Sequence, residues 1–172
     1  MTQTVRPELV GPHRFRSGLF SNNWRLYDRD GVEVARARRM PSRHISQIRF
    51  ADGGTLELRP EGWGTVLAVG DQEGARIDRE SWWGGHWRVS GKGFEYQLTS
   101  DPLPRRWTLR VGGHPVARFA GTLWSYNRVA VEPDFALPVH AVLLSWHVLA
   151  RPWEAMAAPR VLIPRRADDA DD

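Results

Sequence analysis

The chain has 172 residues, of which 41% are hydrophobic and 26% charged, values typical of one soluble domain with a sizeable core. It contains no cysteine, which excludes disulfides, thiolate zinc sites and a cysteine nucleophile. Its net charge is +4, and removing the four aspartates of the closing "DDADD" leaves +8, a balance that attracts anions such as phosphate, nucleic acid or anionic lipid.

The first residues, "MTQTVRPELVGPHRF", lack the apolar core of a secretory signal, so we expect a cytoplasmic protein. Short alternating runs then fill the chain from about residue 14 to 131. In "TLELR" (55–59), for example, two leucines alternate with polar residues, and the same period of two recurs at 24–28, 86–89, 94–98 and 107–111. Alternation of this kind is typical of half-buried antiparallel strands.

Turn signals separate these runs at a spacing of roughly ten residues. They include "DRDG", "DGG", "GKG" and two "GG" pairs, which supply the positive φ angles of tight hairpins. "DRDG" lacks the remaining ligands of a calcium loop, so we interpret it as a hairpin turn. The spacing predicts about a dozen antiparallel strands in an up-and-down sheet or barrel.

Two stretches resemble each other. "WRLYDRDGVEVAR" (24–36) and "WTLRVGGHPVAR" (107–118) share Trp-x-Leu, a glycine turn and a closing Val-Ala-Arg. They predict two similar hairpins, although coincidence between hairpins of this composition is the alternative.

The densest basic segment is "RARRMPSRH" (36–44), around a turn between two strands. A guanidinium group binds phosphate through two parallel hydrogen bonds, so arginines on adjacent strands could bind an inositol phosphate or an anionic lipid headgroup. Alternation places Arg36 and Arg38 on one face and Arg39 on the other if the strand continues. The candidate anion-binding residues are Arg36, Arg38, Arg39 and Arg43. The alternative is a solvated strand edge whose charge discourages aggregation.

A second segment, "RESWWGGHWRVSGKG" (79–93), interleaves basic residues with Trp82, Trp83 and Trp87. Aromatic and basic side chains together suit base stacking on single-stranded nucleic acid, and tryptophan also suits a membrane interface. Because Trp87 belongs to an alternating strand, we expect packing to be the role of at least two of the three tryptophans.

The longest apolar stretch is "LPVHAVLLSWHVLA" (137–150). Fourteen helical residues span about 21 Å, short of the roughly 30 Å hydrocarbon core, so we expect no transmembrane span. A helix that is apolar on nearly all sides is usually buried, and a barrel of a dozen strands has a lumen wide enough to hold it. We predict a central helix at about 138–151, with Pro138 in its first position and an interruption at Pro152, before a further turn or two in "WEAMAA" (153–158).

The segments "WRLYDRDGVEVARARR", "WTLRVGGHPVARFAG" and "LPVHAVLLSWHVLA" together resemble the tubby C-terminal-like group, in particular its LURP-one-related branch. That group also includes the phospholipid scramblase domain. The resemblance covers roughly residues 12–157 and implies a twelve-stranded antiparallel barrel around a central hydrophobic helix. No lipid-headgroup or calcium motif of the group can be placed residue by residue on this chain, so the resemblance implies a fold rather than a function.

The predicted fold is therefore all-β with one C-terminal helix, in a single barrel domain over 1–158. A tail follows over 159–172, and we expect its acidic end to be disordered. No nucleophile elbow, phosphate loop or metal spacing is present, and two histidines in an apolar helix, His140 and His147, are more often structural than metal ligands.

We accordingly expect a non-enzymatic barrel without a cofactor, cytoplasmic and in peripheral contact with membranes. Its expected partner is an anionic phospholipid or a phosphorylated ligand. Two alternatives stay open: a nucleic-acid-binding barrel that uses residues 82–92, and a carrier that holds a small ligand in the lumen. The carrier requires the helix to lie outside the barrel.

Overall fold

The structure, a computed structural model, describes residues 8–18, 21–70, 74–122 and 127–157, with side chains as far as residue 150. The predicted tail at 159–172 lies outside these residues. The elements within them, in chain order, are β1 (Glu8–Leu9), β2 (His13–Ser17), β3 (Asn23–Tyr27), β4 (Glu33–Met40), the 3-10 helix η1 (Pro41–Arg43), β5 (Ile45–Phe50), β6 (Thr55–Pro60), β7 (Thr65–Gly70), β8 (Ala75–Arg79), β9 (His86–Gly91), β10 (Phe94–Ser100), β11 (Arg106–Val111), β12 (His114–Gly121), β13 (Arg128–Pro133), β14 (Leu137–Pro138) and α1 (Val139–Ala157).

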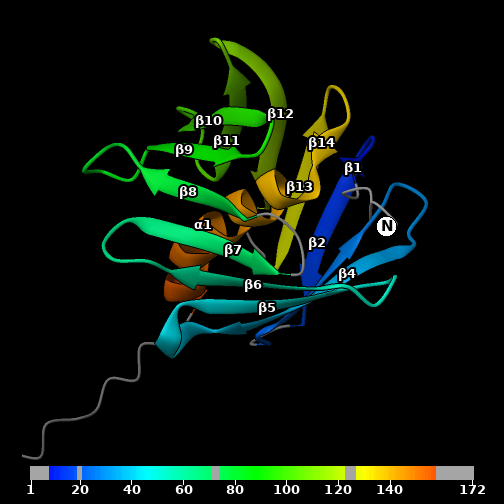
Figure 1. Ribbon diagram of the computed structural model, residues 1–172. Coiled ribbons are helices and arrows are strands. Elements are labelled where there is room, and N and C mark those ends of the chain that lie inside the picture. Colours follow the sequence, from blue (N-terminus) through cyan, green and yellow to red (C-terminus); the bar gives the residue numbers. More distant parts are fainter. Residues whose placement is uncertain (1–7, 19–20, 71–73, 123–126, 158–172) are drawn as a thin grey trace, which may run out of the picture.

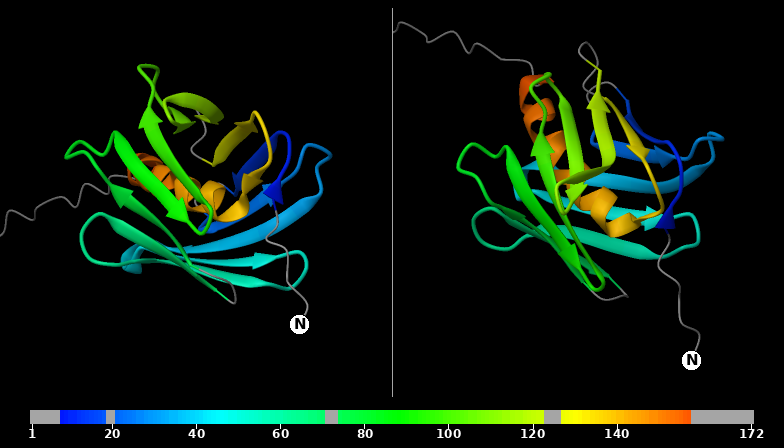
Figure 2. Two further views of the ribbon diagram at one scale, coloured as in Figure 1. Left: turned by 45° about the horizontal axis from the view of Figure 1, so that its top comes forward. Right: turned by 90° about the horizontal axis from the view of Figure 1, so that it is seen from above.

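The twelve strands from β2 to β13 form one closed antiparallel barrel. Each strand pairs with the next one along the chain, and β13 pairs with β2 to complete the ring (Figures 1 and 2). The short strands β1 and β14 pair separately, just before the helix begins. The up-and-down barrel predicted from the turn spacing is confirmed.

The helix α1 is the core of the barrel. Strands lie around its first part (Figure 2), and all twelve residues from 139 to 150 are buried. Trp146 stacks on Phe15 of β2 with ring centroids 4.9 Å apart, and Trp24 of β3 meets it edge-on at 5.6 Å. Several inward-facing positions on the barrel wall hold only alanine, which leaves room for the helix: Ala35, Ala37, Ala68, Ala75 and Ala117.

The helix differs from the prediction at both prolines. It begins at Val139, because Pro138 pairs with Glu8 in the β1–β14 ladder, and it continues through Pro152 to Ala157. Proline disfavours helical geometry at the preceding residue without forbidding it, and it removes a single backbone donor. Pro152 is therefore an interior residue of this helix rather than an interruption of it.

The two hairpins that resemble each other in sequence also share an irregularity. In β3–β4 the pairing register shifts between Leu26 and Tyr27, and in β11–β12 it shifts between Leu109 and Arg110. The two register shifts occupy the same position in the two segments, directly after Trp-x-Leu. The "DRDG" turn is held by Asp28, whose Oδ1 accepts bonds from the backbone N–H groups of Asp30 and Val32. It is a hairpin turn, as predicted.

Candidate anion-binding face

The four arginines predicted as an anion site occupy three different places. Arg36 and Arg38 lie on the outer face of β4, and both are exposed. Arg43 is exposed in η1, at the end of the barrel where β4 turns into β5. The structure therefore brings Arg36 and Arg38 together and leaves Arg43 at the barrel rim.

Arg39 points into the barrel and is only 3% exposed. Its Nη1 donates to the backbone oxygen of His147 at 3.1 Å, and its guanidinium lies 5.5 Å from the ring centroid of Trp146. The alternation predicted for Arg38 and Arg39 is confirmed, because β4 continues to Met40. Arg39 consequently belongs to the core and not to the outer surface that Arg36 and Arg38 share.

The pairing register adds arginines that lie far apart in the sequence. Arg36 stands directly opposite Arg25 of β3 and opposite Arg49 of β5. Arg25 in turn stands opposite Arg16 of β2, which stands opposite Arg128 of β13. We call these five exposed residues the arginine row: Arg128, Arg16, Arg25, Arg36 and Arg49. Directly opposed side chains have Cβ atoms about 5 Å apart, so five positive charges cross five neighbouring strands.

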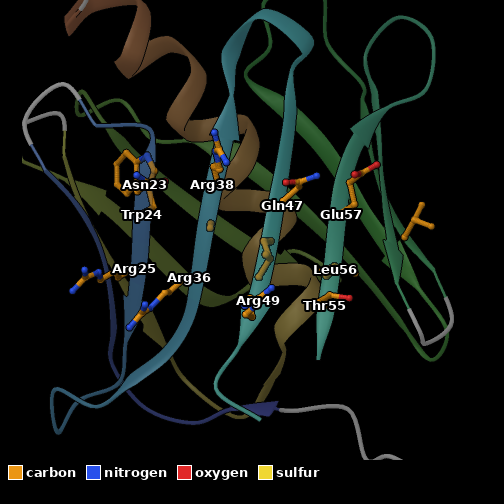
Figure 3. A pocket seen from close by; sticks show the side chains of 13 residues that line it. Asn23, Trp24, Arg25, Arg36, Arg38, Gln47, Arg49, Thr55, Leu56 and Glu57 are labelled. Carbon is orange, nitrogen blue, oxygen red and sulfur yellow. The ribbon is translucent and has the colours of Figure 1, made fainter. Parts of the chain in front are cut away.

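An open groove of about 700 Å³ follows the outer face of β3 to β7 (Figure 3). Three members of the arginine row line it, and Arg38 projects beside them between Asn23 and Gln47, its register partners. The groove therefore offers guanidinium and amide N–H donors from neighbouring strands. Its outward-facing lining residues are Asn23, Arg25, Arg36, Arg38, Gln47, Arg49, Thr55, Glu57 and Val69.

Two carboxylates partly balance this charge: Glu57, which lines the groove opposite Gln47, and Glu33. Glu33 accepts a hydrogen bond from Nε of Arg36, and its other oxygen lies 3.8 Å from Nε of Arg25. The Tyr27 hydroxyl, and then Glu33, raise the pKa of Arg25, which stays charged. Among the described residues, Arg16, Arg38, Arg49 and Arg128 have no ion pair. The row therefore has a net positive charge that a bound anion would neutralise.

Arg76 on β8 and Arg88 on β9 have the opposite surroundings, because each is bonded to a carboxylate. Arg76 donates two hydrogen bonds to Asp78, at 2.8 and 2.7 Å, and Arg88 donates one to Glu80 at 2.7 Å. The bonds from Arg76, with a further bond from Thr65, hold the pKa of Asp78 below its usual value. We call this region, defined by Arg76, Asp78, Glu80 and Arg88, the paired face.

The three tryptophans of the segment 79–93 have different environments. Trp87 packs against the core, whereas Trp82 and Trp83 are 73% and 89% exposed. The expectation that at least two of the three would pack inside is wrong. Trp82 and Trp83 lie between Ser81 and Gly84, which close a turn through a backbone bond of 3.0 Å. Residues at the corners of a turn follow no strand alternation, so the pattern around Trp87 does not extend to them.

The histidines of α1 are core residues. The ring Nδ1 of His147 lies 2.8 Å from the hydroxyl of Ser46, which faces inward from β5, and His140 is also buried. The described residues contain no cluster of three or more histidines, aspartates and glutamates that could hold a metal ion. In that same part of the chain, no helix combines the length and the apolar character needed to cross a bilayer.

Sequence reasoning missed four of the five residues of the arginine row. Each of Arg16, Arg25, Arg49 and Arg128 occupies an outward position of an alternating strand, and this signal is readable from the sequence. Their alignment across strands depends on hairpin length, on the register shift in β3–β4 and on closure of the barrel, which local patterns do not report.

Comparisons with known proteins bear on the fold. No protein-family model matches the chain, and no curated protein matches it in sequence. A crystal structure of a protein from Arabidopsis thaliana superimposes with a TM-score of 0.55, over 84% of this chain and 92% of that one. The two proteins share a related barrel fold. At 10% sequence identity the similarity extends to the fold alone.

Proposed function

We propose that this protein is a non-enzymatic barrel of the tubby C-terminal-like type that binds phosphate-bearing anions on its arginine row. The closed twelve-stranded barrel, its enclosed helix and the plant protein of related fold support the assignment to this type. Because unrelated functions share folds, the proposed activity rests on the surface and not on the fold.

The observation that carries the proposal is the register of five arginines in one row across β13, β2, β3, β4 and β5. Like charges placed directly opposite each other on a sheet destabilise it. A phosphate bound between them removes that repulsion and accepts charge-assisted, bidentate hydrogen bonds. The arrangement is thus complementary to an anion in both charge and geometry.

The groove beside the row has a suitable size for a headgroup or a phosphorylated small molecule, since ligand sites commonly have volumes of about 300–1,000 Å³. Arg36, Arg38 and Arg49 would bind the phosphate oxygens, and the amides of Asn23 and Gln47 would bind hydroxyl groups. The helix α1 occupies the space that a lumen-based carrier would need for its ligand. We place the protein in the cytoplasm, in peripheral contact with anionic membranes.

The test replaces Arg25, Arg36, Arg38 and Arg49 with glutamine. The control replaces Arg59, Arg76, Arg88 and Arg110 with glutamine, which removes the same net charge from β6, β8, β9 and β11. Binding is measured by flotation with vesicles containing phosphatidylserine and by calorimetry with inositol hexakisphosphate, each at low and high salt. Circular dichroism checks that both variants are folded.

The variant with glutamine at Arg25, Arg36, Arg38 and Arg49 should lose at least about tenfold in affinity, because each charged hydrogen bond contributes about 1.5–3 kcal/mol. The control variant should lose much less. Binding should weaken at high salt. Binding to vesicles alone would assign the site to a lipid headgroup, and binding to both probes would assign it to phosphate in general. Equal losses in the two variants, or no binding by the native chain, would refute the proposal.

A further inference from the structure

Three exposed tryptophans form a second surface, separate from the arginine row. Trp63 lies in the β6–β7 connection and is 74% exposed, while Trp82 and Trp83 occupy the β8–β9 turn. The rings of Trp63 and Trp82 have centroids 5.9 Å apart, so the two connections touch at one end of the barrel, on the left of Figure 1. We call Trp63, Trp82 and Trp83 the tryptophan tip.

Arg79 holds this tip in place. Its guanidinium lies 5.2 Å from the ring centroid of Trp63 and 5.9 Å from that of Trp87. The same group donates hydrogen bonds to the backbone oxygens of Ser81 and Trp82. The ring nitrogen of Trp87 donates to the backbone oxygen of Gly84, which fixes the other side of the turn. The tip is therefore ordered in an exposed position by contacts of its own.

Two glycines on either side of Trp63 contribute to this exposure. Gly62 and Gly64 have φ angles of 67° and 83°, a region that other residues rarely adopt. At Gly64 a Cβ atom would also lie 3.1 Å from Cβ of Arg79, so the close approach of the two connections favours glycine there. The backbone conformation thus directs Trp63 outward while its ring meets the guanidinium.

The charge around the tip is not positive. The connection at 61–64 and the one at 80–85 each contain one glutamate and no lysine or arginine. Arg79 is engaged by two carbonyl oxygens, and Arg88 is bonded to Glu80. Nucleic acid requires several cations with free donors along its phosphates, and the two arginines beside this tip already donate to other groups. Small-molecule sites are concave, whereas these rings are 73–89% exposed and project from the barrel.

We propose that the tryptophan tip binds the interfacial layer of a zwitterionic phospholipid bilayer. Indole rings favour the headgroup level, where an apolar body and a polar N–H are both accommodated. The choline group of phosphatidylcholine is a cation that can stack on an indole face, and the exposed Glu61 suits such a cation. This contact does not use the arginine row and does not require anionic lipid.

The experiment uses vesicles of phosphatidylcholine alone, with brominated acyl chains as a quencher of tryptophan fluorescence. The full chain is compared with a Trp82→Ser/Trp83→Ser variant and with Val32→Ser, which changes an exposed apolar residue in the β3–β4 turn. We expect quenching and flotation that persist at high salt for the native chain and for Val32→Ser. The double variant should partition about tenfold less, because two indoles no longer leave water.

Loss of binding in the double variant with retained binding in the glutamine variant of Arg25, Arg36, Arg38 and Arg49 supports the proposal and separates it from the phosphate site. Absence of binding to phosphatidylcholine by the folded native chain would overturn it. So would quenching by a single-stranded oligonucleotide in place of vesicles. Self-association that the Trp82→Ser/Trp83→Ser change abolishes, without vesicle binding, would assign the tip to a second copy of the chain.

Discussion

Outward arginines on β13, β2, β3, β4 and β5 face other arginines, whereas Arg76 on β8 and Arg88 on β9 bond to carboxylates. Both regions are outer faces of the same closed barrel, built from exposed strand positions. On the paired face, Asp78 and Glu80 satisfy the guanidinium donors of Arg76 and Arg88. In the arginine row, Glu33 is shared between Arg25 and Arg36, and Arg16 lies between two further arginines.

An abundance of arginine therefore does not by itself make an anion site. A guanidinium that already donates to a carboxylate has few donors left for a ligand, and its charge is balanced. A guanidinium beside other guanidiniums keeps its donors and raises the local potential. The surroundings of each arginine, rather than the net charge of the chain, therefore distinguish the two faces.

Arg38 and Arg39 lie on opposite sides of β4, and their substitutions should differ strongly in their effect on stability. Arg39→Ala should lower the free energy of unfolding by about 2–4 kcal/mol, because it removes the bond to His147, the contact with Trp146 and buried packing. Arg38→Ala should change it by at most about 0.5 kcal/mol. Urea unfolding measures both. A small loss in Arg39→Ala would mean that the inward guanidinium contributes little to the core.

Charge reversal should change stability in opposite directions on the two faces. Arg16→Glu places a carboxylate between Arg128 and Arg25 and should stabilise the protein by about 0.5–1 kcal/mol. Arg88→Glu removes the partner of Glu80 and places an acid opposite Asp78, so it should destabilise the protein. Thermal unfolding at low salt measures both changes, and effects of the same sign would contradict the distinction between the faces.

The smallest expected effect is a dependence on pH. Since the pKa of Asp78 is lowered by folding, its pair with Arg76 stabilises the protein above the unfolded pKa of about 3.9. This stabilisation is lost as the pH falls through the folded pKa. For a partly exposed pair it amounts to about 0.5 kcal/mol. Urea unfolding of Asp78→Asn should therefore differ from the native chain at pH 7 and converge with it in acid.

Arg16→Gln is the control for this pH dependence, because no carboxylate of the described residues is paired with Arg16. Its difference from the native chain should be the same at neutral and acidic pH. A difference that vanishes in acid would show that the arginine row is also balanced by carboxylates.

Much of the architecture follows from local sequence patterns. Alternating residues identify the strands and the inward and outward faces, including the opposite directions of Arg38 and Arg39. The length and all-round apolar character of 137–150 predict an enclosed helix, because no solvated position suits such a surface. The bounds of that helix are less predictable, since Pro138 and Pro152 behave according to their tertiary neighbours.

Local sequence is enough to predict whether a strand residue faces into or out of the barrel, because a strand alternates its faces with a period of two whatever lies beside it. Which outward residues meet depends on how the strands pair. The ladder that aligns Arg128, Arg16, Arg25, Arg36 and Arg49 requires a fixed register in every hairpin between them and the closing pair of β13 with β2. Trp63 and Trp82 likewise come together through connections nineteen residues apart, whose contact no local pattern encodes.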